Sequence, residues 1–412
     1  MFFSDITTAR KKITPYIKKT ELLYANRLSE QVLTDVYLKL ENLQFSGSFK
    51  VRGALHKLLT LTDEQRQCGV IAASAGNHAQ GVAIGAKQLG IQAKIVMPKT
   101  APLAKVNATK RFGAEVILAG DFYDEAYAHA CELQKQTGMT FIHPFDDEAV
   151  IAGQGTIGLE MYEAQPDLEI VFIPIGGGGL AAGVGYALKT LNPNIRIIGV
   201  QSAHANSMQY SLQHGCVERI CVARTIADGI AVATPGQHTF PLCQNYVDQV
   251  VTVTETQMAV AMLDLLENCN LLCEGAGAAS VAAIQNYPEL IEGKKVGAIL
   301  SGGNIDINTF ESVINTGLKA LGRRSEIKLS LTDHPGELAR LLDLIAEQEA
   351  NILHIRQSRD RDNLTLYQMG VTLVFETLDQ SHKERVLYAL EQAGYLLCTL
   401  PADAKLSLPS SY

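Results

Sequence analysis

The feature that most constrains the fold is a regular alternation of short apolar runs with helical segments along most of the chain. This β-α-β-α order predicts parallel sheets flanked by helices, because parallel strands need a crossover connection that a helix normally supplies. The predicted strands are residues 36–40, 70–73, 93–98, 114–118, 140–143, 170–175, 195–201 and 296–300, and residues 5–32 are predicted to be helical with a break at Pro15. We therefore expect an α/β unit with two parallel lobes.

The pattern changes at residues 318–324, where we place a domain boundary. Residues 326–331 alternate apolar and polar side chains, which is typical of an antiparallel strand with one buried face. A helix up to Gln348, a hairpin of residues 351–358 and 364–375, and a helix over residues 379–393 follow. The predicted order is the βαββαβ of a ferredoxin-like α+β domain over residues 325–400, with a frayed tail over 401–412.

The composition excludes several classes of partner. A net charge of −8 over 412 residues argues against nucleic acid or an anionic membrane as the main partner. No apolar run is long enough to span a membrane, and the start lacks a signal-peptide pattern. The eight cysteines show neither CxxC nor zinc spacing, so we expect reduced thiols and a cytoplasmic protein.

A single lysine, Lys50, stands in a loop rich in serine and glycine, between a predicted strand and a predicted helix over residues 54–61. The positive end of a helix dipole lowers the pKa of a lysine at the helix start. A neutral amine is the form that makes a Schiff base. A solvated surface lysine is the ordinary alternative, and three other segments argue against it.

The first of these segments is the run Gly176–Gly179, which follows a buried strand and precedes a helix. Successive glycine N–H groups converge on one anion, and the helix N-terminus adds its dipole. The loop holds no lysine or arginine, so the backbone would bind a phosphate. A dinucleotide site is the rival interpretation, but it needs an acid at the end of the next strand, where Gln201 stands.

The other two segments also follow predicted strands. Residues 74–78 (Ser-Ala-Gly-Asn-His) lead into a helix and are candidates for binding a substrate carboxylate at its N-terminus. Ser301 ends the strand of residues 296–300 and begins Ser-Gly-Gly-Asn.

Four segments together resemble the threonine dehydratases. They are Ser-Phe-Lys-Val-Arg-Gly-Ala around Lys50, Ser74–Gly81, the glycine run and Ser301–Asn304. The threonine dehydratases are fold-type II pyridoxal phosphate enzymes, and the resemblance covers about residues 5–320. It implies that Lys50 is catalytic and carries the cofactor. It also implies further cofactor-binding residues, Phe49 stacking on the ring and Asn77 bonding its phenolic oxygen among them, and a set of substrate-binding residues. The cofactor set is Lys50, Phe49, Asn77, Gly176, Gly177, Gly178, Gly179, Leu180, Glu274 and Ser301, and the substrate set is Ser74, Ala75, Gly76, Asn77 and His78.

The resemblance implies a catalytic domain over residues 1–320, with a small lobe of about 51–150 inserted between 1–50 and 151–320. The implied reaction converts L-threonine to 2-oxobutanoate and ammonia, and L-serine to pyruvate, as a regulated first step toward isoleucine. A serine at the position of Ser301 suits β-elimination, whereas an aspartate would favour transamination. Serine dehydratase, a serine racemase-like enzyme, a degradative threonine dehydratase and a sensor with a decayed catalytic unit are the alternatives.

Two departures from the related racemases sharpen this prediction. Ala75 stands where serine racemases carry the serine that acts on the opposite face, so we expect little racemisation. Gln201 and Ser207 stand where the racemase metal site has acids, so no such metal is expected.

The turn Asp333-His334-Pro335-Gly336 resembles that of ACT domains, which sense amino acids. The resemblance implies isoleucine as effector with valine as its antagonist, in a homodimer or homotetramer. The alternative is a domain that only builds an oligomer interface.

Overall fold

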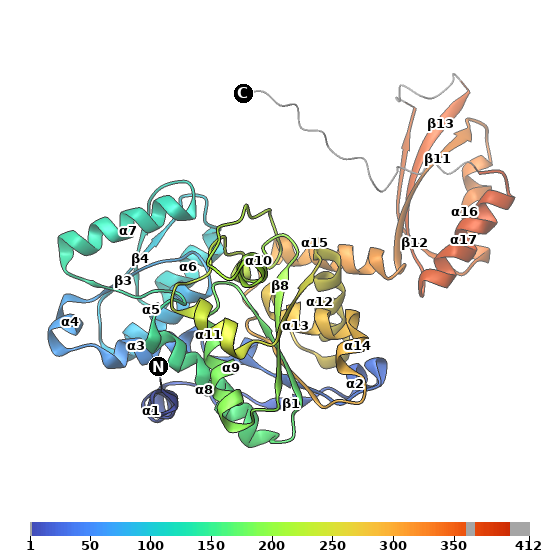
Figure 1. The fold of residues 1–412 in the computed structure, drawn as a ribbon. Helices are drawn as coiled ribbons and strands as arrows, with labels where there is room; N and C mark the ends of the chain where they lie inside the picture. The colour runs from blue at the N-terminus through green and yellow to red at the C-terminus, as the bar shows by residue number, and fades with distance from the viewer. Residues whose placement is uncertain (1, 360–366, 396–412) are drawn as a thin grey trace. The chain divides into compact units, whose positions relative to one another are not determined.

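The structure of the chain, a computed structural model, describes residues 2–359 and 367–395. The chain folds into two compact units, Met1–Val313 and Ile314–Tyr412 (Figure 1). No helix within the described ranges is long and apolar enough to cross a membrane.

The first unit contains two sheets. The six-stranded sheet has the order β1 (Leu22–Tyr24), β2 (Val36–Lys39), β10 (Val296–Ile299), β7 (Ile170–Pro174), β8 (Arg196–Ser202) and β9 (Gln249–Val253). The four-stranded sheet has the order β5 (Glu115–Leu118), β4 (Ala93–Met97), β3 (Val70–Ala73) and β6 (Thr140–Phe141). All neighbouring strands are parallel except the pair β1–β2. The predicted parallel α/β architecture is therefore confirmed.

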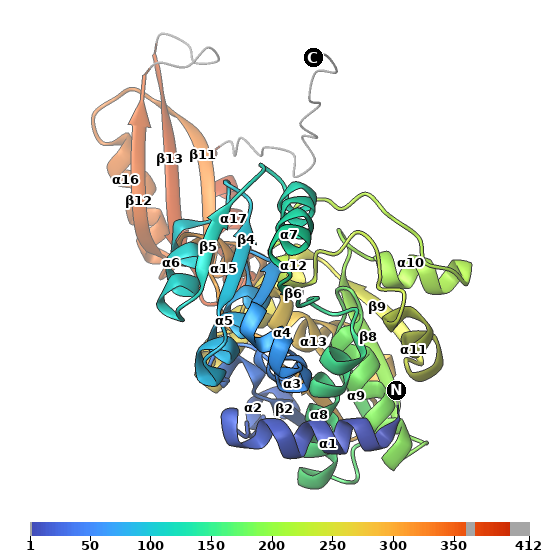
Figure 2. The same cartoon turned by 90° about the vertical axis from the view of Figure 1, so that its left-hand side faces the viewer.

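Helices connect these strands and cover both sheets (Figures 1 and 2). In chain order they are α1 (Phe3–Ile13), η1 (Thr14–Tyr16), α2 (Asn26–Val32), η2 (Glu41–Leu43), α3 (Lys50–Thr60), α4 (Asp63–Cys68), α5 (Asn77–Leu89), α6 (Leu103–Arg111), α7 (Tyr123–Thr137), α8 (Glu148–Ala164), α9 (Gly179–Leu191), α10 (Ser207–His214), η3 (Asp228–Ile230), α11 (Thr239–Tyr246), α12 (Glu255–Cys269), α13 (Gly275–Asn286) and α14 (Pro288–Ile291). Helix α15 (Ile307–Ala320) runs from the first unit into the second.

Successive strand residues face opposite helical layers, which is why the central strands β3 and β7 are apolar at every position. In β7, Phe172 packs in one core cluster with residues of α12 and α13, whereas Val171 packs in another with residues of α8 and α9. In β3, Ala72 packs with residues of α3 and α5, whereas Ile71 packs with residues of α7.

The prediction of helix over residues 5–32 is wrong in one part. The chain forms α1 and η1, with Pro15 in η1, but then enters β1 before α2. Strand β1 has three residues, too few for a sequence period, and it forms by antiparallel pairing with β2. Strand β6 is shorter than predicted and ends at Phe141.

The second unit is an antiparallel sheet with two helices. Its elements are β11 (Arg324–Thr332), α16 (Glu337–Glu347), β12 (Asn351–Ser358), β13 (Gln368–Glu376) and α17 (Gln380–Gln392), and the strand order is β11-β13-β12. Both helices pack in one core with the sheet, through side chains such as Leu341, Val371 and Val386. The last strand of the predicted βαββαβ order lies outside the described residues.

Candidate active site

Lys50 is the first residue of α3 and is half-buried. Its Nζ donates to the backbone oxygen of Pro144 at 2.8 Å and lies 5.2 Å from the centroid of the Phe49 ring. Burial lowers the pKa of Lys50 to about 8, and the charge of Glu274 acts in the opposite direction. The direction matches the sequence prediction, but burial rather than the helix dipole is the leading cause. A substantial fraction of this amine is therefore neutral near pH 8.

The segment before Lys50 is bonded to the end of β10. Ser48 and Gly302 form an isolated antiparallel bridge, and the N–H of Phe49 donates to the oxygen of Ser301 at 3.1 Å. Ser301 is buried and the Phe49 ring packs against the core next to α9. The fold thus brings three predicted site residues, Phe49, Lys50 and Ser301, to one place.

The run Gly176–Gly179 forms the turn from β7 into α9, with the buried Leu180 in the first turn of the helix. Gly178 has a φ of 101°, in the left-handed region that favours glycine. The buried N–H groups of Gly177 and Gly178 donate to no acceptor within residues 2–359 and 367–395. Buried N–H groups are nearly always paired, so this turn is built to receive an acceptor.

Asn77, the first residue of α5, is held by two side-chain hydrogen bonds. Asn304 donates from Nδ2 to Oδ1 of Asn77 at 2.8 Å and to the oxygen of Ser46 at 2.7 Å. Asn77 in turn donates from Nδ2 to Oε1 of Glu274 at 2.6 Å. These bonds determine which way the amide of Asn77 points. They leave its second N–H available to an acceptor such as a phenolic oxygen.

Glu274 precedes α13 and is 4% exposed. Burial, with the charge of Asp228, raises the pKa of Glu274 to about 8, against the effects of Asn77, Lys105 and Lys50. A Cβ on Gly302 would lie 2.3 Å from Oε1 of Glu274, so glycine at that position makes room for this carboxyl group. The charge of each of the two groups, Glu274 and Lys50, thus acts against the effect of burial on the pKa of the other.

The predicted substrate-binding segment joins β3 to α5. The hydroxyl of Ser74 accepts the N–H of Gly76 at 3.2 Å, and a Cβ on Gly76 would meet no atom within 4 Å. Ala75 packs on the core of the four-stranded sheet. The ring of His78 is hydrogen-bonded through Nε2 to the oxygen of Ile142 at 2.8 Å, and burial, with the charge of Lys50, lowers its pKa to about 3. His78 is thus a neutral structural group, and substrate contacts of this segment stay a prediction.

One segment of the site, residues 143–147, was missed in the sequence. The oxygen of Pro144 accepts Lys50, and a Cβ on Gly177 would meet the ring of Phe145 at 2.4 Å. The carboxylate of Asp146 accepts three N–H groups at the start of α11, between 2.8 and 3.1 Å. The sequence feature that could have identified this segment is its position after β6, a strand that is parallel to β3.

Residues 13–302 match the model of a family described as pyridoxal-phosphate dependent enzymes. The chain belongs to this family. In this pyridoxal phosphate enzyme, residues 325–394 match the ACT domain family as well.

Similar proteins extend the comparison over nearly the whole enzyme. The L-threonine ammonia-lyase of Thermotoga maritima is 47% identical over 391 residues, which cover 95% of this chain and 97% of that protein. The L-threonine ammonia-lyase of Geobacter sulfurreducens is 45% identical over 398 residues, with 97% and 99% covered. The solved structure of processed threonine deaminase isoform 2 from Solanum lycopersicum superposes with a TM-score of 0.74 at 40% identity, covering 76% of this chain and 86% of that one.

The cofactor of this enzyme is pyridoxal phosphate, and the residues present fit it. Lys50 offers a half-buried amine of lowered pKa, and the unpaired N–H groups of Gly177 and Gly178 fit a phosphate. The oriented amide of Asn77 fits an oxygen on the ring.

Proposed function

We propose that this enzyme removes water from L-threonine to give 2-oxobutanoate and ammonia, and that it converts L-serine to pyruvate in the same way. The observation that carries the proposal is Lys50, whose pKa is lowered to about 8 and whose Nζ donates to Pro144, the residue before Phe145, which lies against the glycine turn. The choice of threonine is supported by the names of two relatives that match nearly the whole chain.

Bound pyridoxal phosphate supplies a carbonyl carbon for the substrate amino group and a conjugated ring that spreads negative charge. Lys50 is the group that takes the α-proton, because its amine is partly neutral near pH 8. The oxygen of Pro144 orients Nζ of Lys50 through their hydrogen bond. Asn77 presents a fixed N–H, and Ser301 offers a hydroxyl that does not force protonation of a ring nitrogen.

We propose that the enzyme catalyses elimination rather than racemisation. Ala75, the second residue of the segment that leads into α5, has no hydroxyl. The overall reaction balances as threonine to 2-oxobutanoate plus ammonia, because the water lost from the β-carbon is regained in hydrolysis. A serine-specific dehydratase and a racemase-like activity are the competing outcomes of the assay below.

The test is a keto-acid and ammonia assay on the enzyme loaded with pyridoxal phosphate. We expect 2-oxobutanoate and ammonia in equal amounts from L-threonine, and pyruvate from L-serine. Visible absorbance of the lysine-bound cofactor without keto acid from either substrate would overturn the proposal. The same result would favour a sensor whose catalytic unit has decayed.

We further propose that the ACT domain binds isoleucine, with valine as antagonist, and that the enzyme is a cytoplasmic homo-oligomer on a biosynthetic route. The support in the chain is the turn before α16. Arg359 donates to both oxygens of Asp333, at 2.7 and 2.9 Å, and holds the pKa of that carboxyl below its usual range. Helix α16 starts at Glu337, whose N–H donates to the oxygen of His334 at 3.3 Å. The N–H groups of Leu338 and Ala339 donate to no acceptor within the described residues, and we propose that they receive a carboxylate.

A further inference from the structure

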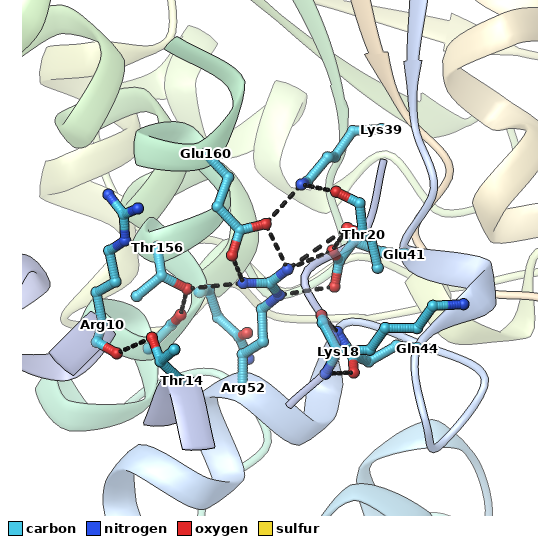
Figure 3. Close-up of polar contacts among 12 residues, drawn as sticks. Arg10, Thr14, Lys18, Thr20, Lys39, Glu41, Gln44, Arg52, Thr156 and Glu160 are labelled. Carbon is cyan, nitrogen blue, oxygen red and sulfur yellow. Dashed lines mark hydrogen bonds and ion pairs between the residues drawn. The ribbon is translucent and has the colours of Figure 1, made fainter. Parts of the chain in front are cut away.

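Four charged side chains form a buried cluster between α3, α8 and the segment of β2 and η2 (Figure 3). They are Lys39 in β2, Glu41 in η2, Arg52 in α3 and Glu160 in α8, called here the Arg52 cluster. Arg52 and Glu41 are fully buried, Lys39 is 1% exposed and Glu160 is 6% exposed. Two positive and two negative groups balance, so the cluster is neutral as a whole.

Every N–H of the Arg52 guanidinium has a partner (Figure 3). Its Nε and Nη2 donate to the two oxygens of Glu41 at 2.8 and 2.7 Å. Its Nη1 and Nη2 donate to the two oxygens of Glu160 at 2.7 and 2.9 Å, and Nη1 also donates to the hydroxyl of Thr156 at 3.2 Å. The carboxylates of Glu41 and Glu160 thus bind the planar guanidinium of Arg52 on two edges, which restricts both its position and its orientation.

Lys39 completes the cluster. Its Nζ donates to Oε2 of Glu160 at 2.5 Å and to the backbone oxygen of Thr20 at 2.7 Å. Burial favours the neutral acid of Glu160, but the hydrogen bonds and charges of Arg52 and Lys39 outweigh it and hold its pKa below the usual range. These contacts favour the charged form of Glu160, whereas burial lowers the pKa of Lys39 against the opposing charges of Glu160 and Glu41.

Stability alone is a weak reason for such a cluster. Removing charges from water costs about as much as their attraction returns, and well-packed apolar side chains often serve the fold equally well. A forked ion pair also fixes the position and orientation of the groups that it joins. The place of Arg52 in α3 indicates which part of the chain the cluster positions.

Arg52 follows Lys50 by two residues in α3, so the two side chains leave the helix in different directions. Lys50 reaches Pro144, while Arg52 reaches η2 and α8. The next residue, Gly53, closes the contact with α8, because its Cβ would lie 2.7 Å from the oxygen of Val150 and 2.4 Å from Nε2 of Gln154. These contacts with η2 and α8 therefore fix both the rotation of the first turn of α3 about its axis and its distance from α8.

We propose that the Arg52 cluster is a positioning device that holds the first turn of α3 so that the Lys50 amine stays aligned with the glycine turn. Within residues 2–359 and 367–395, the hydrogen bonds of the Arg52 side chain go to Glu41, Thr156, Glu160 and Thr20 rather than to the glycine turn or Pro144, so Arg52 acts through the backbone of α3. The inference rests on the proposed role of Lys50 as the cofactor-binding and proton-transferring residue.

The test compares Arg52→Lys, which keeps the charge but loses the fork, with Arg10→Lys. Arg10 makes a comparable fork with Glu163 on the same helix α8, but from α1 and at a partly exposed position. We expect Arg52→Lys to lower kcat roughly 10- to 100-fold, as small misplacements of a catalytic group do, with KM for threonine within about threefold of the parent. We also expect a shifted pH midpoint of the visible absorbance and slower reloading of cofactor onto the apoenzyme. Arg10→Lys should change none of these.

A milder pair covers the case in which Arg52→Lys does not fold. Thr156→Val removes one partner of Arg52 and keeps the side-chain shape, whereas Thr156→Ser keeps the hydroxyl. The valine variant should show the same shifts on a smaller scale, and the serine variant should match the parent.

Variants that fold with an unchanged absorbance midpoint, reloading rate and kcat would overturn the inference, as would a loss of thermal stability with these three quantities unchanged. A parent that loads cofactor but forms no keto acid would instead overturn the proposed function. The absorbance and reloading measurements would still test the positioning role, because neither requires turnover.

Discussion

The ring of Phe145 lies against Gly177, so close that a Cβ on this glycine would meet ring carbons at 2.4 Å. The preceding residue, Pro144, accepts the hydrogen bond from Lys50. Pro144 and Phe145, two consecutive residues after β6, therefore connect Lys50 with the glycine turn. Asp146 accepts three N–H groups at the start of α11, which holds this segment in place.

Gly177→Val should weaken the binding of pyridoxal phosphate by at least about tenfold, because the new side chain must displace the ring of Phe145 and disturb the turn. Cofactor titration by visible absorbance measures this. The double variant Gly177→Ala/Phe145→Ala removes the obstacle and should recover part of the affinity lost in Gly177→Ala alone. Parental affinity in Gly177→Val would mean that the phosphate binds elsewhere.

Lys50→Ala should remove the visible absorbance of the bound cofactor and lower turnover of threonine by at least about 10³-fold, because one amine serves both covalent binding and proton transfer. Circular dichroism should show an intact fold. Lys110→Ala, at an exposed position of α6, is the matched control and should keep full activity. Substantial turnover without Lys50 would contradict its assignment.

The sequence was sufficient for the parallel architecture, because strands buried on both faces are apolar at each position and their order is local. It also singled out the glycine run and Ser301, which directly follow predicted strands, and Lys50, which stands in a loop between a predicted strand and a helix; their roles in the site stay predictions. It did not reveal Asn304 as the partner that orients Asn77, because that bond joins residues 227 positions apart. The Arg52 cluster was hidden for the same reason, since Glu160 lies in a long apolar helix and its partners Lys39 and Arg52 come from β2 and α3.

The buried ring of His78 predicts a pH dependence of stability. Its pKa falls to about 3 in the folded protein, so between about pH 6.5 and 3 the unfolded chain binds a proton that the folded chain does not. Stability should therefore fall as the pH drops below 6.5, by about 1.4 kcal/mol per pH unit from this group. His78→Gln lacks the titrating ring, so urea unfolding at pH 7.5 and 5.5 should show a smaller loss than the parent shows. His214→Gln, at an exposed position of α10, should behave as the parent does, and equal losses in all three proteins would refute the prediction.

The last prediction concerns the ACT domain, whose turn before α16 carries the forked pair of Asp333 and Arg359. An effector changes activity only if it binds one state of the enzyme better than another, and a difference of about 1–3 kcal/mol gives 5- to 150-fold effects. We expect millimolar isoleucine to shift the threonine saturation curve and valine to oppose that shift. Asp333→Ala should keep the activity measured without effectors but lose the response, because the substitution releases Arg359 and alters the turn.

Asp343→Ala, at an exposed position of the same helix α16, is the matched control and should respond as the parent does. A chain ending before residue 325 should retain threonine turnover and show no response to either amino acid. The response to isoleucine and the size of the oligomer, both measured on the truncated chain, separate the sensing role from the interface role. A domain that only builds an oligomer interface would change the size of the oligomer, and the full-length enzyme would not respond to isoleucine. Identical saturation curves for the full-length enzyme with and without both amino acids would exclude the sensing role and leave the interface role.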